Sequence, residues 1–416
     1  MISLDRISRI GFGTHAISSQ VPEHRDALIH AIRQGCTLVD TSANYAAGDA
    51  ECLIGEILSS DKTLDAFVVS KSGVVVKDIA ESVGIATDGQ TLPLSEACGE
   101  LQSLERMVIS SLTRLSRQQH DGYLLHNPEA DLIEGRMESK QLYEYLAGAF
   151  EVLERFVVDG VIRYYGISSN TFHLPMSQGV TIDLNRVIRV ASSVSRQNRF
   201  KFIEFPYNLI ESGATRSHHD GLSLLEVAHR NGIIALSNRP LNARSESGAI
   251  RLAIYPDDEV IVDSLADRAI VDEWLTTISR QLRAIDEPDD PLSFRIVRHL
   301  NQHWMDVGNP EAVEKIFLEH VLPFLVHIYS GAIPDTDRAP HQAFYDVVHR
   351  YSRHTRRRRS ESIADDLGFT AMMASGRSLP ALACEKYLQA GVDCVLVGMR
   401  KVRYVDELQH LFKRGL

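Results

Sequence analysis

The sequence predicts an α/β protein with a (β/α)8 barrel of the TIM type, and three observations lead to this prediction. Eight short apolar runs alternate with amphipathic helical stretches along the chain. Several of these runs end in an ionisable or hydroxyl side chain, as expected at the carboxyl-terminal rim of a barrel. A glycine repeatedly separates a helix from the next strand. An open doubly wound sheet also alternates strands and helices, but its polar groups would gather at one crevice.

The apolar runs are interpreted as strands because continuous hydrophobic stretches are typical of strands that are buried on both faces. In chain order they cover residues 8–14, 37–42, 66–72, 122–127, 162–169, 202–207, 233–238 and 394–398.

Four helix-to-strand junctions share one feature. Helices are predicted over residues 22–34, 141–159, 220–231 and 378–390, and each is followed by a glycine, namely Gly35, Gly160, Gly232 and Gly391. A glycine just past a helix adopts the left-handed conformation that turns the chain back into a strand. The repetition indicates one architecture throughout.

Two stretches exceed what a minimal barrel needs. Residues 74–95 form a long polar connection, and about 150 residues separate the seventh and eighth strands, where one helix and short loops suffice. The longer stretch shows helical periodicity at 270–285, 292–304, 310–329 and 341–351. We therefore predict a barrel of residues 1–245 and 360–416, and a helical insertion of residues 246–359 that could act as a lid or a substrate-specificity subdomain.

Composition bounds the function classes. The chain has 416 residues, of which 44% are hydrophobic and 24% charged, which is ordinary for a globular protein. Its net charge of -11 argues against binding to a phosphate backbone, so no nucleic-acid partner is expected. The arginine run at 356–359 is interpreted as a solvated face or an interdomain clamp.

The five cysteines show no C-x-x-C spacing, which indicates reduced thiols. The amino terminus lacks a signal-peptide pattern, and no run of eighteen apolar residues occurs. We expect a soluble, cytoplasmic protein without a membrane partner, as a monomer or weak homo-oligomer. The triplet His218, His219 and Asp220 lacks a further ligand at helical spacing, so no metal is predicted.

Four residues carry the predicted chemistry. Asp40, Lys71 and His126 end predicted strands, and Tyr45 follows Asp40 by five residues. An ammonium about 4 Å from a phenolate contributes about 4 kcal/mol at an effective dielectric of about 20. Lys71 is therefore expected to lower the pKa of Tyr45 toward neutrality, where a general acid works well. The set suits protonation of a carbonyl oxygen while another group delivers hydride.

Several motifs occur in an order that resembles the aldo-keto reductase superfamily. They are Val39–Tyr45 (VDTSANY) followed by Gly48, Glu51 and Gly55, Ser70–Lys71, Ser111–Leu115 (SLTRL), Asp121–Glu129 (DGYLLHNPE), Gly166–Asn170 (GISSN), Pro206–Glu211 (PYNLIE) and Val397–Arg400 (VGMR). The resemblance covers residues 1 to about 245 and 360 to 416 and skips the insertion. It implies the same barrel, a nicotinamide cofactor, with NADP(H) preferred and NAD(H) possible, and a small-molecule carbonyl or sugar substrate.

The resemblance also implies roles for single residues. Tyr45 would be the proton donor, Lys71 and Asp40 would tune it, and His126 would orient the carbonyl. Arg400 and Lys401, ahead of a helix that starts near Tyr404, would bind the adenosine 2′-phosphate. The whole set of implied cofactor contacts is Gly13, Thr14, Ser168, Ser169, Asn170, Glu204, Tyr207, Asn238, Arg239, Leu241, Gly398, Arg400 and Lys401.

Two departures from the family pattern bear on mechanism. Glu204 stands where relatives commonly place Gln against the carboxamide, and Asn238, Arg239 and Pro240 replace the usual aromatic-Ser-Pro. An ionised Glu204 would favour the oxidised cofactor, unless it is neutral or points elsewhere. Two alternative functions stay open: a cofactor-binding regulatory protein, like the channel β-subunits of this fold, and a sugar or polyol dehydrogenase working in the oxidative direction.

Overall fold

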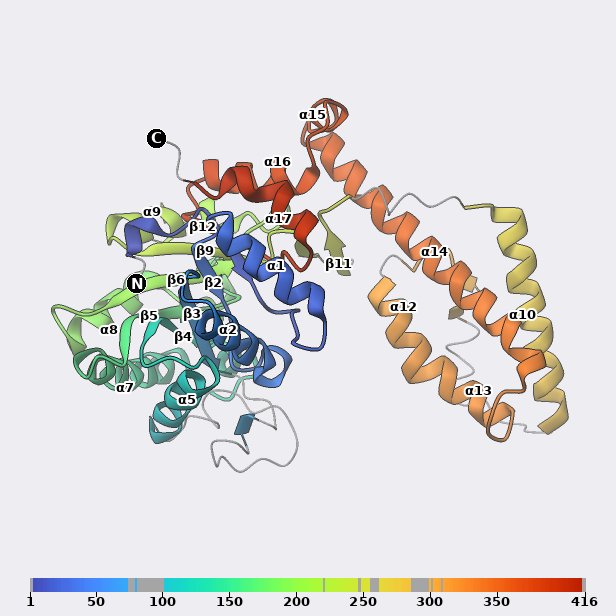
Figure 1. Ribbon diagram of the computed structural model, residues 1–416, viewed down its shortest axis with the longest axis horizontal. Coiled ribbons are helices and arrows are strands. Elements are labelled where there is room, and N and C mark those ends of the chain that lie inside the picture. Colours follow the sequence, from blue (N-terminus) through green and yellow to red (C-terminus); the bar gives the residue numbers. More distant parts are fainter. Residues whose placement is uncertain are drawn as a thin grey trace. The chain divides into compact units, whose positions relative to one another are not determined.

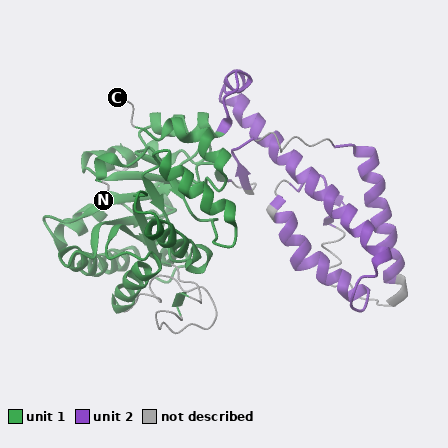
Figure 2. Cartoon of the chain, in the orientation of Figure 1, with its two compact units in different colours: residues 1–243, 380–416 green, residues 244–379 purple. Residues whose placement is uncertain are grey.

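The computed structural model describes residues 3–73, 79–80, 101–219, 221–245, 248–254, 262–285, 299–300, 302–307 and 310–413. Most of the predicted connection at 74–95, together with Cys98 and Asp220, lies outside the described residues. The chain divides into two compact units, residues 1–243 with 380–416, and residues 244–379 (Figure 2). Each unit is described by itself below.

The first unit is a closed barrel of eight parallel strands (Figure 1). In chain order the strands are β1 (Ile10–Gly13), β2 (Leu38–Asp40), β3 (Phe67–Gly73), β4 (His120–His126), β5 (Ile162–Ser168), β6 (Phe200–Pro206), β9 (Ile234–Asn238) and β12 (Cys394–Val397). The sheet closes where β1 pairs with β12, with Ile10 opposite Val395. The predicted barrel is confirmed, and each of the eight predicted runs overlaps one of these strands.

Helices surround the strands (Figure 1). The helices of this unit are α1 (Pro22–Arg33), α2 (Asp49–Ser60), α5 (Leu101–Arg114), α6 (Ala130–Ile133), α7 (Ser139–Val158), α8 (Leu184–Val194), α9 (Leu224–Arg230), α16 (Leu379–Gln389) and α17 (Val402–Leu408). The predicted helix at 220–231 begins later, at Leu224, because Ser223 caps it and exchanges hydrogen bonds with Glu226.

The glycines at the four junctions have the predicted conformation. Their φ angles are 99° at Gly35, 73° at Gly160, 60° at Gly232 and 102° at Gly391. At the first junction, the Cys36 amide donates to the Ala31 carbonyl over 2.9 Å, the bond that closes a Schellman turn. The same turn therefore ends each of these helices and starts the following strand.

The inside of the barrel is filled with side chains. Leu38, Phe67, Val69, Leu124, Phe202, Leu236, Cys394 and Leu396 are each at most 4% exposed and form one cluster. Side chains alternate between the two faces of a strand, so the residue two positions after each cluster member also points inward. This places Asp40, Lys71, His126, Glu204 and Asn238 in one layer beyond the apolar cluster, toward the carboxyl ends of the strands. We call these five residues the polar layer.

The second unit falls between β9 and β12 in the sequence and is mainly helical. It begins with a two-stranded sheet of β10 (Asn242–Ser245) and β11 (Gly248–Arg251). Its helices are α10 (Ser264–Ile285), α12 (Pro310–Ile316), α13 (Leu322–Ile328), α14 (Asp335–Asp366) and α15 (Thr370–Ala374), and a π-helical segment, Phe317–Val321, joins α12 to α13. It has its own core, in which Trp274 stacks on Phe344 with 3.8 Å between ring centroids. Trp304, the second of the two tryptophans of the chain, is buried in the same core.

The predicted helix at 341–351 was too short, since α14 runs from Asp335 to Asp366 and the predicted domain boundary at residue 359 falls inside it. Apolar periodicity ends at Tyr351, but the charged residues that follow are good helix formers, and Gly368 is the first glycine after them. The predicted helix at 292–304 lies mostly outside the described residues.

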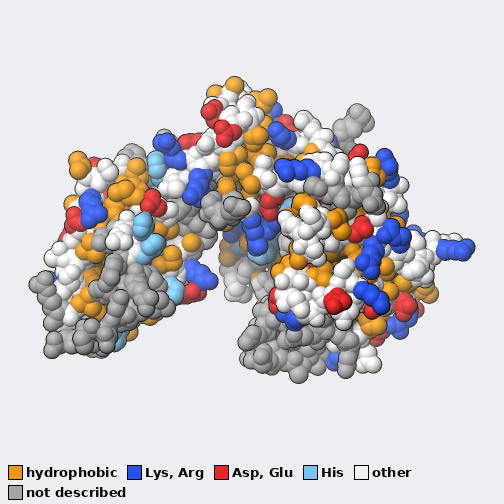
Figure 3. Space-filling view, turned by 180° about the vertical axis from the view of Figure 1, so that it is seen from behind, with side chains coloured by type: hydrophobic (Ala, Val, Ile, Leu, Met, Phe, Trp, Pro, Cys, Tyr) orange, Lys and Arg blue, Asp and Glu red, His pale blue; other side chains and the backbone are white. Residues whose placement is uncertain are grey.

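The arginine-rich part of α14 is partly neutralised within its own unit. Arg350 pairs with Asp267 of α10, and Arg357 donates to Glu361 one turn later over 2.8 Å. On the face of the molecule in Figure 3, basic and acidic side chains are interspersed with hydrophobic ones. In the part of the chain that the structure describes, no helix is both long and apolar enough to cross a membrane.

Candidate active site

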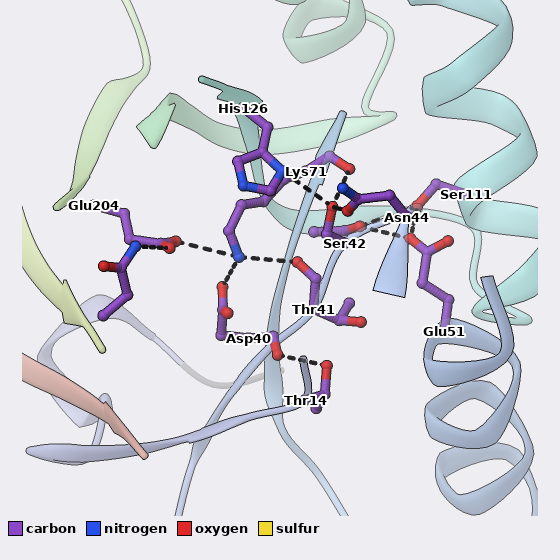
Figure 4. A network of polar contacts seen from close by, with 12 residues as sticks. Thr14, Asp40, Thr41, Ser42, Asn44, Glu51, Lys71, Ser111, His126 and Glu204 are labelled. Atoms are coloured by element: carbon purple, nitrogen blue, oxygen red, sulfur yellow. Dashed lines mark hydrogen bonds and ion pairs between the residues drawn. The ribbon is translucent and has the colours of Figure 1, made fainter. Parts of the chain in front are cut away.

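The polar layer centres on the ammonium of Lys71, which has no exposed surface. Its Nζ donates to the Asp40 carboxylate and to the Thr41 carbonyl, the latter over 3.0 Å. Glu204 Oε2 lies 3.2 Å from the same nitrogen. Lys71 thus reaches between two carboxylates that come from β2 and β6 (Figure 4). Burial opposes its charge, but these two neighbours hold the pKa of Lys71 above its ordinary value, so it stays protonated.

Tyr45 lies beside this group. It starts a short 3-10 turn, Tyr45–Gly48, after β2, and Lys71 Nζ lies 5.2 Å from the centroid of its ring. The ring also meets His126 edge-on, with 6.3 Å between centroids. Asp40, Tyr45, Lys71 and His126, which are far apart in sequence, therefore come together at one end of the barrel.

The backbone that holds Tyr45 is unusual. Ala46 and Ala47 have φ angles of 48° and 52°, and Gly48 follows with 90°. A left-handed alanine costs roughly 1–3 kcal/mol, so the surrounding contacts must impose this conformation. At Gly48 a Cβ would lie 2.8 Å from Arg114 Cδ, so a side chain there would require Arg114 to move.

The direction predicted for the pKa of Tyr45 was wrong. Burial raises the pKa of Tyr45, and the attraction of Lys71 does not overcome it, because the negative charges of Asp40 and Glu204 offset that attraction. The sequence predicts one cation next to the phenol, but the loss of water on burial and the second carboxylate, Glu204, follow only from the fold. Tyr45 therefore keeps its proton at neutral pH.

The two carboxyls differ in their protonation. Burial and the nearby charge of Glu204 raise the pKa of Asp40 to about 8, even though Lys71 acts in the opposite direction. Burial also opposes ionisation of Glu204, but Lys71 and a hydrogen bond from Asn238 Nδ2, 2.8 Å long, outweigh it and lower the pKa of Glu204. Two buried carboxyls that share one cation cannot both ionise easily.

His126 is neutral at physiological pH. Burial and the positive charge of Lys71 lower the pKa of His126 to about 4. Its Nδ1 lies 3.3 Å from Ser42 Oγ, and the tautomer decides which atom donates. Ser42 has one hydroxyl hydrogen, and Asn44 Oδ1, 2.6 Å away, competes with Nδ1 for it. If Ser42 donates to Nδ1, the hydrogen of the imidazole stays on Nε2, which can then donate to a bound oxygen.

His15 was not among the predicted site residues, but it meets the Tyr45 ring edge-on with 5.1 Å between centroids. It follows β1 in the chain, and its side chain is exposed. Burial of part of the ring and the charge of Lys71 lower the pKa of His15, so its imidazole is neutral above that value. Its only sequence signal is its place directly after Thr14 at the end of a strand.

A second buried polar cluster, centred on Glu51, lies next to Lys71 on the outer face of β3. Ser70, which precedes Lys71 in β3, and Ser111 of α5 both donate to Glu51 of α2, and Arg114 Nε lies 2.6 Å from the same carboxylate. Glu51 has no exposed surface. At Gly55 a Cβ would lie 2.6 Å from the Arg114 carbonyl, so α2 and α5 approach closely there. This group fixes two helices to the strand that carries Lys71.

Several predicted cofactor residues lie near the polar layer but bind other protein groups. Thr14 donates to the Asp40 carbonyl over 2.8 Å and so ties β1 to β2. Ser168 ends β5 opposite Glu204, and the hydroxyl of Ser169 lies 3.1 Å from that of Thr171. The side chain of Asn170 donates from Nδ2 to Asn127 Oδ1 over 2.8 Å. The backbone N–H of Asn170 donates to the Glu129 carboxylate over 2.7 Å. These bonds fix the loop that follows β5.

The loops after β6 and β9 are joined by an ion pair. Arg239, whose φ is 51°, donates to Glu211 over 2.6 Å. Tyr207 is buried and meets Tyr387 edge-on, with 5.6 Å between centroids. Leu241 is also buried, in the large apolar cluster to which both strands and helices of the barrel contribute.

The predicted phosphate-binding residues, Arg400 and Lys401, come from the loop between β12 and α17. Gly398 and Arg400 are exposed, and Lys401 directly precedes α17. Lys401 Nζ lies 3.8 Å from Glu23 of α1. Partial burial, with the nearby charges of Arg400 and Lys401, lowers the pKa of His24, which shows that these cations share one neighbourhood.

The residues at the barrel end fit a nicotinamide cofactor. Within the described residues, the buried atoms Ser237 Oγ and Asn238 Oδ1 have no hydrogen-bond partner, and the latter can accept from a carboxamide. A Cβ on Gly398 would meet nothing nearer than the Gly13 carbonyl oxygen at 3.9 Å. The space beside the backbone of Gly398 is therefore free of other protein atoms within that distance. Among the residues that the structure describes, no three His, Cys, Asp or Glu side chains are grouped to hold a metal ion.

Comparison with known proteins identifies relatives of this chain. The model of a family described as the aldo/keto reductase family matches residues 9–259. An uncharacterised oxidoreductase of Bacillus subtilis, YqkF, is 29% identical over 163 residues, which cover 39% of this chain and 45% of the relative. The chain thus aligns with less than half the length of that relative.

Two solved structures are also similar. A glycerol dehydrogenase from Gluconobacter oxydans has 16% identity and a TM-score of 0.49, with 99% of this chain and 88% of that chain covered. An aldo/keto reductase from Klebsiella pneumoniae, solved with NADP and acetate, has 22% identity and a TM-score of 0.37, with 56% of this chain and 65% of that chain covered.

Proposed function

Because the chain belongs to the aldo/keto reductase family, we propose that it is an NAD(P)(H)-dependent oxidoreductase that moves a hydride between nicotinamide and a carbonyl or alcohol carbon. The observation that carries the proposal is the convergence of Asp40, Tyr45, Lys71 and His126 at one barrel end. A phenol, an ammonium, a carboxyl and a neutral imidazole together suit proton transfer to an oxygen.

Each residue has a distinct role in this proposal. A bound nicotinamide supplies or accepts the hydride. The Tyr45 phenol donates a proton to the substrate oxygen, and the Lys71 charge stabilises the phenolate that this leaves. His126 donates from Nε2 to the same oxygen in the tautomer in which Ser42 donates to Nδ1.

The raised pKa of Tyr45 favours one direction at neutral pH. A phenol that keeps its proton is ready to protonate a carbonyl oxygen during reduction. Alcohol oxidation needs the phenolate as a base, and that form becomes available only as the pH rises. We therefore expect reduction to dominate near pH 7 and oxidation to gain in alkaline solution.

NADP(H) is the proposed cofactor, with NAD(H) as a second possibility. Arg400 and Lys401 precede α17 and supply two cations for a 2′-phosphate. Asn238, with its unpartnered Oδ1, and the hydrogen-bonded loop at Ser168, Ser169 and Asn170 are the candidates for the carboxamide. Gly13 and Gly398 leave the backbone accessible between these two ends.

Hydroxylated substrates form the second candidate, as for a sugar or polyol dehydrogenase. The observation in favour is that two neutral imidazoles, of His15 and His126, flank Tyr45. Each imidazole offers one donor and one acceptor, which suits hydroxyl groups near the reacting carbon.

The test is the substitution Tyr45→Phe, assayed with an aldehyde and with an alcohol, and with NAD(H) and NADP(H). Loss of the proton donor should lower kcat by about 10²- to 10⁴-fold, while the Kd for the cofactor stays within twofold of the wild type. A wild-type protein that binds the cofactor but turns over no carbonyl or alcohol would favour the regulatory alternative. Equal rates in the two proteins would exclude Tyr45 as the donor.

A further inference from the structure

Lys71 has two carboxylates as partners, although one would neutralise its charge. The side chains of Asp40 and Glu204 both point at its Nζ (Figure 4), and their strands, β2 and β6, stand opposite each other in the barrel. Lys71 is 0% exposed, Glu204 1% and Asp40 3%, so water contributes little to screening their charges. The net charge beside Tyr45 is therefore set by the protein.

Glu204 is held in this arrangement from both ends. Oε2 lies 3.2 Å from Lys71 Nζ, and Oε1 accepts from Asn238 Nδ2 over 2.8 Å. Asn238 comes from the neighbouring strand β9, and it follows Ser237, the residue opposite Phe205 in β6. The carboxylate of Glu204 is thereby directed toward the lysine.

We propose that Glu204 is a positioning residue that acts through Lys71: as a second counter-ion it offsets the positive charge next to Tyr45 and so keeps the proton donor a weaker acid. This inference rests on the function proposed above for Tyr45. A glutamine at the same place could keep the hydrogen bond to residue 238 but would carry no charge.

The charge count supports this assignment. The titratable groups that face Tyr45 are Lys71, Asp40 and Glu204 from the strands, and the two imidazoles of His126 and His15. The imidazoles are neutral in alkaline solution, where Tyr45 ionises. There both carboxyls are ionised, so one positive and two negative charges leave a net charge of -1 beside the phenol. Without the Glu204 charge the sum is zero.

The experiment measures ionisation of Tyr45 directly, without cofactor or substrate. Tyrosinate absorbance is titrated against pH in the wild type and in Glu204→Gln, and the same titration in each Tyr45→Phe counterpart is subtracted to remove the other twelve of the thirteen tyrosines. In Glu204→Gln the midpoint of Tyr45 should fall by on the order of one pH unit, because one buried negative charge is lost. Asn238→Ala is the control that removes the hydrogen bond but keeps the charge, and its midpoint should stay close to that of the wild type.

An unchanged or higher midpoint in Glu204→Gln overturns the inference, and so does an equal fall in Asn238→Ala. If Glu204→Gln fails to fold, the wild type alone decides: a Tyr45 midpoint at or below about 10, the value of a free tyrosine, excludes the proposed offset. The basic limb of the pH profile of kcat/KM for reduction should shift in the same direction as the midpoint. Absence of any turnover would contradict the proposed function but would leave the titration result unaffected.

Discussion

The Glu51 carboxylate pairs with Arg114 across the contact between α2 and α5, with 2.6 Å between Oε2 and Nε. Glu51 has no exposed surface and also accepts from Ser70, the neighbour of Lys71 in β3. A structural ion pair therefore supports the strand that carries Lys71 from its outer face.

We expect Glu51→Ala to lower the free energy of unfolding by about 3–5 kcal/mol, because it leaves the mostly buried Arg114 without its counter-ion. The matched control is Glu56→Ala, since Glu56 pairs with Arg25 but its side chain is 62% exposed, and its loss should cost at most about 1 kcal/mol. Urea unfolding followed by circular dichroism measures both. Equal effects at the two positions would show that the Glu51 pair contributes no more than a surface one.

In the left-handed turn after Tyr45, we expect that replacing an alanine by glycine does not destabilise the fold. Ala47→Gly should leave stability unchanged or raise it by up to about 1 kcal/mol, because glycine adopts a φ of 52° without strain. The looser turn should lower kcat, since Tyr45 is then held less firmly. Ala147→Gly in the middle of α7 is the control and should cost about 1 kcal/mol. A similar loss of stability in both variants would mean that the turn is unstrained.

We expect the ionisation of Glu129 to make the stability of the fold depend on pH. Burial raises the pKa of Glu129 to about 7 from an ordinary value of 4.5, and its Oε2 has no hydrogen-bond partner among the described residues. Because the folded pKa is the higher one, the stability that the protonated carboxyl contributes is complete below about pH 4.5 and is lost as the pH rises through about 7. Glu129→Gln should therefore be more stable than the wild type by up to about 3 kcal/mol at pH 8, and nearly equal to it at pH 4.5. Urea unfolding at the two pH values gives the comparison, and a difference that does not depend on pH would contradict it.

We expect substitution of His15 to change the substrate preference. In His15→Phe the imidazole beside Tyr45 is replaced by an apolar ring of similar shape, so a hydroxylated aldehyde should show a KM about 3- to 10-fold higher, the size of one lost hydrogen bond. The KM of an alkyl aldehyde should stay the same or fall. Steady-state kinetics with the two aldehydes measures the ratio, and an equal change for both would show that His15 does not select for hydroxyl groups.

The insertion can be removed to separate its role from that of the barrel. The two units have separate apolar cores, and the second unit comprises residues 244–379. Replacing residues 246–377 by a flexible linker should change the range of substrates more than the Kd for the cofactor. Isothermal titration with NADP(H) and a panel of aldehydes measures the two effects. Equal losses of cofactor and substrate binding would mean that the insertion contributes to the stability of the barrel.

The sequence was sufficient for the barrel because its signals are local. Eight apolar runs, and four glycines with positive φ after helices, each follow from residue type and spacing. The polar layer also follows, since residues two positions beyond an inward apolar side chain point inward again. The convergence of Asp40, Lys71 and His126 could therefore be predicted before the fold was known.

Other features depend on quantities that no local pattern contains. The pKa of Tyr45 depends on the water that burial excludes and on Glu204, which stands 159 positions away in the sequence. The strained alanines after Tyr45 carry no glycine signal, so their conformation could not be expected. The end of α14 was missed for a different reason, because its last two turns pack few apolar side chains and show no periodicity.

The location of the two tryptophans has a practical consequence. Trp274 and Trp304 both lie in the helical insertion, and the barrel contains none. Fluorescence excited selectively at the indole ring therefore monitors the insertion alone, while circular dichroism records both units. A melting curve followed only by emission would not detect unfolding of the barrel. The two optical signals must therefore be recorded together to learn which unit unfolds first.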